Sequence, residues 1–322
     1  YSMAKREYEL NYSFLKAINE GDINRLVDLQ TSQTPSFLME DVHKYLDEKY
    51  AGDFQMKEFE RVAIFQQMDA LGELDNVNTH IYNNKSAFQQ LHSFFTGFGP
   101  LIILFLTIFV ASEILTDDRK HRTIKSGQPL GFRKYIFYQS VTVFLIMTAV
   151  TAALVTLFIL VTGLLYGFGP LSLDVTQYAY QDGYRGEETN FFDIPLSTFL
   201  IQSGVLTVIL IYLFIRINAV LSLVFRHDIV VMIIGFLLVA FNRIYSGGSE
   251  ETLLGLPAHI FPQNYFEFGN ILNGVQNYLT MSDRFTFMNG LIVLAVTIVV
   301  IEIILYIIIF WMDRQKFERA VG

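Results

Sequence analysis

The 322-residue sequence contains no cysteine and few charged residues. Without cysteine, neither a disulfide framework nor a thiolate metal site is possible. The six histidines are scattered without metal-ligand spacing, at His43, His80, His92, His121, His227 and His259. Only 17% of the residues are charged and 52% are hydrophobic, whereas soluble domains carry about 25% charged residues. The composition therefore indicates a membrane protein.

The chain also lacks a nucleotide-binding loop. Residues 126–134, SGQPLGFRK, superficially resemble a phosphate-binding loop. The GxxxxGK(S/T) spacing is absent, however, and no strand is expected before it. We therefore expect that the chain is not itself an enzyme and holds no cofactor or metal of its own.

Five apolar runs approach or exceed the ~20 residues that cross a bilayer. They cover residues 98–115, about 138–166, about 197–224, 229–245 and 288–311. Because single segments that cross lipid do so as helices, the predicted fold class is an all-α polytopic membrane protein with five visible spans.

The charges of the loops predict the orientation of the spans. The loop at 117–134 holds six Lys or Arg against two Asp, so we expect it in the cytoplasm. The acidic segment at 174–193 is then outside, the turn at 225–228 inside, and the acidic segment at 246–287 outside. The C-terminal tail is inside, in what we expect to be a bacterial plasma membrane.

Residues 1–96 form a predicted extracytoplasmic domain, and residues 97–322 a transmembrane domain. Five spans with a cytoplasmic C-terminus place residues 1–96 outside. Tyr1 is neither an initiator Met nor the start of a signal peptide, so we expect a missing first span, which makes six. A cleaved signal peptide is the alternative.

Helical periodicity predicts a small helical domain in this outer segment. Helices are expected over residues 5–20, 36–51 and 57–71. In the first, the apolar residues at helical spacing are Tyr8, Tyr12, Leu15 and Ile18, and Gly21 provides a stop. We interpret these apolar faces as a packed core in preference to a ligand site.

Ionisable side chains inside apolar runs are candidates for function, because each costs at least ~2.5 kcal/mol in lipid on insertion scales. Arg216 and Asn218 lie in the third run and Glu302 in the last. Glu302 is either a protonated carboxyl bonded to a neighbouring helix or, with Arg216 and Asn218, part of a translocation path or a subunit contact.

The stretch after the first run resembles the type-2 permeases (ABC-2) of ATP-binding cassette exporters. In that family a Glu at the end of a span precedes a basic, Thr-containing segment, a Pro and the next span. The matching residues are Glu113, Arg122, Thr123, Pro129 and Lys134. Arg122 stands where the family usually has Gly. Residues 221–236 are similar to the family's short inner turn, and residues 253–272 to its re-entrant helices.

The resemblance implies the membrane subunit of an exporter of peptides, antibiotics or lipids. It also implies a second permease, identical or similar, and cytoplasmic ATPase subunits that hold ATP and Mg. The segment at 117–126 would be a coupling helix that docks on the ATPase. The residues implied for coupling are Glu113, Asp118, Arg119, Arg122, Thr123, Lys125, Pro129 and Arg226. Without the resemblance, a positive-inside anchor explains this loop equally well.

Two other functions remain open from the sequence. One is a membrane-anchored receptor or immunity protein that binds a ligand through residues 1–96. The other is an ion-coupled secondary transporter that depends on Glu302. The substrate cannot be read from apolar spans, since lipid-facing residues have the same composition.

Overall fold

The chain folds mostly into helices, as a computed structural model shows. The structure describes residues 2–31, 59, 62–63, 66–72, 74, 77–120, 131–181, 190–225, 227–245, 252–253 and 255–311. The chain divides into two compact units, each built from three segments. Unit 1 comprises Tyr1–Ser93, Phe158–Ile201 and Leu272–Asp283. Unit 2 comprises Phe94–Leu157, Gln202–Ile271 and Arg284–Gly322.

Unit 1 begins with two helices, α1 (Ser2–Glu20) and α2 (Ile23–Thr31). Gly21 separates them with a φ of +66°, a conformation that glycine adopts without strain. The carboxylate of Asp22 accepts a hydrogen bond from the backbone N–H of Arg25 at 3.1 Å and so caps α2. The predicted stop at Gly21 is therefore confirmed.

The predicted core face of α1 is not buried. Its four apolar residues are each at least 60% exposed: Tyr8, Tyr12, Leu15 and Ile18. The helical periodicity is real, but periodicity shows only that a face is apolar and not what covers it. The interpretation of this face as packed core is wrong for α1.

A β-hairpin in unit 1 was not predicted. Strands β1 (Asp174–Tyr178) and β2 (Phe191–Pro195) pair antiparallel, with Val175 opposite Ile194. Tyr178 and Phe191 on this hairpin lie 4.9 Å apart between ring centroids, and the Tyr278 ring of α12 (Val275–Thr280) lies 5.1 Å from the first and 6.1 Å from the second. Aromatic pairs at such separations stabilise a core beyond their area burial.

Two short helices complete the part of unit 1 that leads into unit 2. They are α4 (Thr79–Tyr82) and α5 (Ala87–Thr96), which continues into unit 2. Asn78 caps α4 by accepting hydrogen bonds from the backbone N–H groups of His80 and Ile81. Ile81 then packs with Val27, Leu71 and Leu173 in a second small core.

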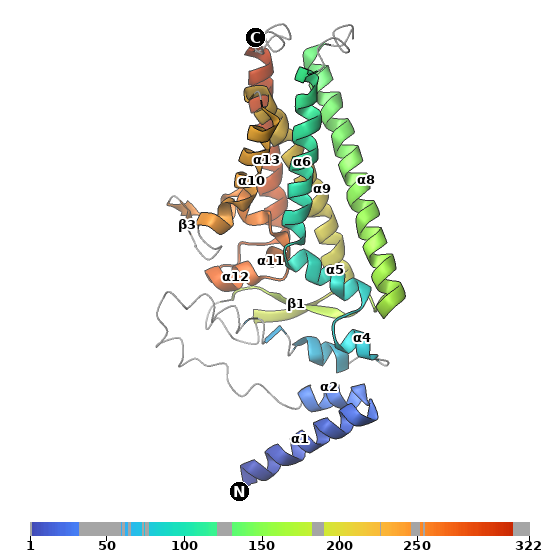
Figure 1. Ribbon diagram of the computed structural model, residues 1–322. Helices are drawn as coiled ribbons and strands as arrows, with labels where there is room; N and C mark the ends of the chain where they lie inside the picture. Colours follow the sequence, from blue (N-terminus) through green and yellow to red (C-terminus); the bar gives the residue numbers. More distant parts are fainter. Residues whose placement is uncertain are drawn as a thin grey trace. The chain divides into compact units, whose positions relative to one another are not determined.

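Five long apolar helices supply most of unit 2. They are α6 (Gly99–Lys120), α8 (Phe132–Tyr166), α9 (Leu196–Val224), α10 (Asp228–Tyr245) and α13 (Phe287–Trp311). In Figure 1 they run lengthwise in roughly the same direction. α6 packs closely on α10, where a Cβ at Gly235 would lie 2.7 Å from the side chain of Ile108. Small residues permit such close approach between apolar helices.

Three of these helices, α8, α9 and α13, are long and apolar enough to cross a membrane. They coincide with the predicted spans at 138–166, 197–224 and 288–311. A fourth is obtained if the pair Thr79–Thr96 and Gly99–Glu113, bent by 69°, counts as one broken span. The chain is thus a multi-pass membrane protein, whereas five or six spans and the sidedness of the loops stay predictions.

Short elements connect α10 to α13. They are β3 (Thr252–Leu253), β4 (Leu256–Pro257), η2 (Ala258–Ile260), η3 (Pro262–Tyr265) and α11 (Phe268–Leu272). The hydroxyl of Tyr265 donates to the carbonyl oxygen of His259 at 2.9 Å. Burial raises the pKa of Tyr265 to about 12, so its hydroxyl keeps the proton that this bond uses. Whether these turns re-enter a membrane stays a prediction.

An exposed ion pair ties this connection to α10. Nε and Nη2 of Arg243 donate to the two carboxylate oxygens of Glu267 at 2.7 and 2.6 Å. The same guanidinium lies 4.3 Å from the centroid of the Phe98 ring. A bidentate bond and a cation–π contact together fix the end of α10.

Candidate functional site, an ion pair and cavity between apolar helices

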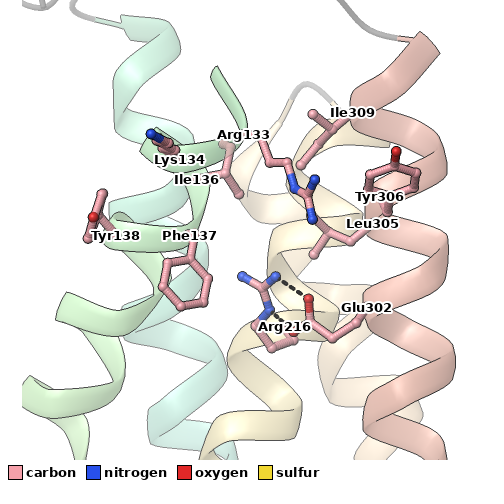
Figure 2. Close-up of a pocket in the computed structure, with 10 residues that line it drawn as sticks. All are labelled: Arg133, Lys134, Ile136, Phe137, Tyr138, Arg216, Glu302, Leu305, Tyr306 and Ile309. Carbon is pink, nitrogen blue, oxygen red and sulfur yellow. Dashed lines mark hydrogen bonds and ion pairs between the residues drawn. The ribbon is translucent and has the colours of Figure 1, made fainter. Parts of the chain in front are cut away.

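Arg216 of α9 and Glu302 of α13 meet inside unit 2, although 86 residues separate them. Nε of Arg216 donates to Oε1 of Glu302 at 2.5 Å, and Nη2 donates to Oε2 at 2.6 Å. Figure 2 shows the two side chains facing each other between the helices. The planar guanidinium matches the carboxylate in a bidentate arrangement. The sequence singled out both residues, and the structure brings them together.

Tyr212 adds a third donor to the carboxylate. It lies four residues before Arg216 on α9, and its hydroxyl donates to Oε1 of Glu302 at 3.0 Å. Its ring packs edge-on against Phe144 of α8, with centroids 5.5 Å apart. The sequence analysis missed Tyr212, although its spacing of four from Arg216 puts both side chains on one helix face.

The two partners of the ion pair are buried unequally. The side chain of Arg216 is 4% exposed and that of Glu302 is 37% exposed. A buried arginine is tolerated among apolar helices only where an opposite charge or polar groups meet it. Glu302 supplies that charge. The two N–H donors and one O–H donor facing it suit an ionised carboxylate, so the prediction of a protonated carboxyl is not supported by this geometry.

A cavity of about 400 Å³ adjoins the ion pair. Its size lies within the range of about 300–1,000 Å³ typical of small-molecule sites. Residues of α8, α9 and α13 line it, as Figure 2 shows: Arg133, Lys134, Ile136, Phe137, Tyr138, Arg216, Glu302, Leu305, Tyr306 and Ile309. The cavity therefore joins three helices and combines an apolar lining with a few charged groups.

The first turn of α8 contributes two cations to this cavity. Arg133 reaches from α8 toward α13 (Figure 2), where its guanidinium lies 4.6 Å from the centroid of the Tyr306 ring. Lys134 follows it in the lining. Positive side chains at a helix N-terminus are opposed by the helix dipole. Their position is therefore not explained by the stability of α8 alone.

One N–H group of Arg216 lacks a partner. Nη1 is buried, and no hydrogen-bond acceptor lies within reach of it among the described residues. Buried polar groups are nearly always hydrogen-bonded. Arg216, which lines the cavity, thus keeps an N–H donor that no described side chain accepts from.

The other predicted path residue does not join the site. The side-chain amide of Asn218 donates to the carbonyl oxygen of Phe214 at 2.8 Å within α9, and Asn218 is not among the residues that line the cavity. Two residues on from Arg216, it points to another face of the helix.

The residues predicted to couple the chain to an ATPase lie mostly outside the described part. Glu113 is exposed on α6, and Asp118 and Arg119 belong to the last turns of the same helix, where the side chains are not described. The remaining five are outside the described residues: Arg122, Thr123, Lys125, Pro129 and Arg226.

Comparison with known proteins yields one match. A family model described as serpentine type 7TM GPCR chemoreceptor Srz matches residues 48–176, less than half of the chain. The matched residues include α6 and α8. No curated protein and no solved structure matches the chain.

This match contradicts the resemblance to ABC-2 permeases, because the matched family is one of receptors. The predicted exporter function is wrong on this finding, and so are the predicted partners, the ATPase subunits and a second permease. The basic loop at 117–134 carries the charge of any cytoplasmic anchor, so its likeness to a coupling helix was not specific. A coupling role for its residues presupposed the ATPase and is not proposed.

Proposed function

We propose that the protein is a multi-pass membrane receptor that binds a small ligand in the cavity between α8, α9 and α13. The observation that carries the proposal is this cavity, with a buried arginine in its wall whose Nη1 is unpartnered. The match to a chemoreceptor family over residues 48–176 supports the same class of function. Binding of this kind requires no catalytic group or cofactor.

A ligand in the cavity can act on the helices through the ion pair. Arg216 and Glu302 join α9 to α13 with two short hydrogen bonds. A ligand that takes over a hydrogen bond of Arg216 weakens this link, and it shifts the helices by as much as its affinity differs between the two arrangements. The ion pair is then the element that ligand binding changes.

One observation favours a second binding surface in the same receptor. The exposed apolar face of α1, which includes Tyr8 and Tyr12, offers a hydrophobic surface in unit 1. The receptor alternative predicted from the sequence places a ligand site in residues 1–96. Removal of α1, residues 2–20, tests this surface separately from the cavity and keeps Val27 of α2 in its core.

The midpoint of thermal unfolding provides the readout of the test, because a ligand that binds only the folded state raises it. We would reconstitute the full chain in phosphatidylcholine nanodiscs and add a panel of small carboxylic acids, phosphates, amines and uncharged alcohols. Ligands of the cavity should raise the midpoint of thermal unfolding.

The double variant Arg216→Met with Glu302→Met is the matched control, because it removes both charges and keeps the side-chain volume. The response should disappear in this variant and persist when residues 2–20 are deleted. The reverse pattern would move the ligand site to α1. Failure of every compound, together with stoichiometric co-purification of an ATP-hydrolysing subunit, would overturn the receptor proposal.

A further inference from the structure

We infer that the cavity between α8, α9 and α13 binds a phosphate oxyanion that carries an apolar tail. The inference deepens the proposed function and rests on it, because it names the chemical class of the ligand of the same cavity. The phosphate can come from a membrane lipid headgroup or from a soluble alkyl or inorganic phosphate. Both sources present the same charged oxygens to Arg216 and to the first turn of α8.

The charge of the lining carries the first step. Arg133, Lys134 and Arg216 bring three positive charges to the cavity, and among the described residues Glu302 is the single carboxylate in its lining. Glu302 is already engaged by Arg216 and Tyr212. Two positive charges therefore remain without a carboxylate of the lining to match them. An anion of one or two charges would balance the cavity, whereas a cationic or neutral ligand would not.

The unsatisfied donor carries the second step. The side chain of Arg216 is only 4% exposed, and its Nη1 has no acceptor among the described residues. Nη1 and Nη2 belong to one planar guanidinium, which recognises phosphate oxygens with parallel hydrogen bonds. Because Nη1 is buried, a phosphate oxygen would reach this guanidinium as Arg216 loosens its bonds to Glu302, which is the change in the ion pair that the proposed function requires.

The apolar part of the lining carries the third step. Leu305 and Ile136 are buried in the cavity wall, and Phe137 of α8 is 48% exposed beside them. Figure 2 shows Phe137 and Leu305 on the sides of α8 and α13 that face the cavity. An acyl or alkyl chain would pack on these side chains. Basic pockets between transmembrane helices are known to bind the headgroups of anionic lipids.

Direct lipid binding tests the inference. We would place the full chain in phosphatidylcholine nanodiscs with and without phosphatidylglycerol, release it into the gas phase, and count retained phosphatidylglycerol by mass spectrometry. The double variant Arg216→Met with Glu302→Met should retain about tenfold less than the wild type, the effect of losing a charge-assisted hydrogen bond.

A second variant gives an effect of opposite sign. Glu302→Gln removes the competing negative charge and leaves Arg216 in place, so retention of phosphatidylglycerol should rise several-fold. A purely structural role of the ion pair would lower retention in both variants. Arg243→Gln is the matched control, because it breaks the other bidentate Arg–Glu pair of unit 2, which does not line the cavity. Retention should not change.

A second measurement distinguishes a lipid headgroup from a soluble phosphate as the ligand. Inorganic phosphate, added to protein in phosphatidylcholine nanodiscs, should raise the midpoint of thermal unfolding of the wild type if the natural ligand is soluble. Retention of phosphatidylglycerol without this rise identifies a lipid. If neither probe binds, or if the double variant binds both as well as the wild type does, the phosphate inference is wrong.

The two proposals fail in different ways. A rise of the unfolding midpoint with amines or alcohols, but with neither phosphate probe, would leave a receptor whose ligand is not an anion. Binding of phosphatidylglycerol that leaves the unfolding midpoint unchanged would leave an anion site without a receptor response.

Discussion

Two Arg–Glu pairs in unit 2 share nearly the same geometry but lie in different surroundings. Arg216 and Glu302 make bonds of 2.5 and 2.6 Å, and Arg243 and Glu267 make bonds of 2.7 and 2.6 Å. The arginine is the buried partner in one pair and the exposed partner in the other. Arg216 is 4% and Arg243 43% exposed, whereas Glu302 is 37% and Glu267 15% exposed. Distance alone therefore does not predict the energetic role of a pair, because burial decides what the loss of one partner leaves behind.

Glu302→Met should have the largest effect on stability. It leaves the guanidinium of Arg216, which is 4% exposed, among apolar helices without its anion, and an uncompensated buried charge costs about 3 kcal/mol. The measurement is the free energy of unfolding in mixed micelles, from titration with a denaturing detergent.

Glu302→Asp keeps the negative charge but shortens its reach to Arg216, so it should recover part of this loss. If Glu302→Met were as stable as the wild type, the pair with the buried arginine would be no different from the pair with the exposed one.

Tyr212→Phe should have the next largest effect. It deletes the hydroxyl that donates to Glu302 at 3.0 Å and keeps the ring that packs on Phe144. A hydrogen bond to a charged acceptor contributes about 1.5 kcal/mol. The same detergent titration measures the loss, and Phe144→Leu, which keeps the hydroxyl, separates ring packing from hydrogen bonding.

Glu267→Gln should reduce the free energy of unfolding by about 1 kcal/mol or less. It leaves Arg243, which is 43% exposed and keeps its contact with the Phe98 ring, and such an exposed charge loses at most about 1 kcal/mol. Because salt screens exposed charges, the difference from the wild type should shrink at high ionic strength. A loss as large as that of Glu302→Met would remove the distinction between the pairs.

The double variant Arg216→Met with Glu302→Met should have the smallest effect, within about 0.5 kcal/mol of the wild type. Replacement of a buried ion pair by apolar residues of similar volume is often neutral. A double-mutant cycle compares this result with the two single variants and gives the coupling energy. The coupling should be several times larger for this pair than for Arg243 and Glu267.

The sequence predicted the apolar helices of unit 2 well, because a span of ~20 apolar residues is a property of composition. The run at 288–311 became α13, Phe287–Trp311, almost without change. It also identified Arg216 and Glu302 as unusual. Their pairing could not be predicted, because it depends on the rotation of α9 and α13 about their axes.

Other features depended on contacts that no local pattern contains. The hairpin of β1 and β2 is short, and its residues pair through register and through aromatic packing on α12. From the sequence, Arg133 was interpreted only as one of the positive charges of the loop at 117–134. In the structure its guanidinium lies over the Tyr306 ring. The cavity was therefore missed, since its charges come from segments about 80 and 170 residues apart in the printed sequence.

The division of unit 1 into three separate segments has a consequence for biosynthesis. Its aromatic core joins Phe59, Tyr178, Phe191 and Tyr278. A ribosome completes Phe59 long before Tyr278, and domains generally form as their residues emerge. The early part of unit 1 must therefore wait for the synthesis of residues 272–283 before its core closes, and during this interval it exposes aromatic side chains that a chaperone or a protease can recognise.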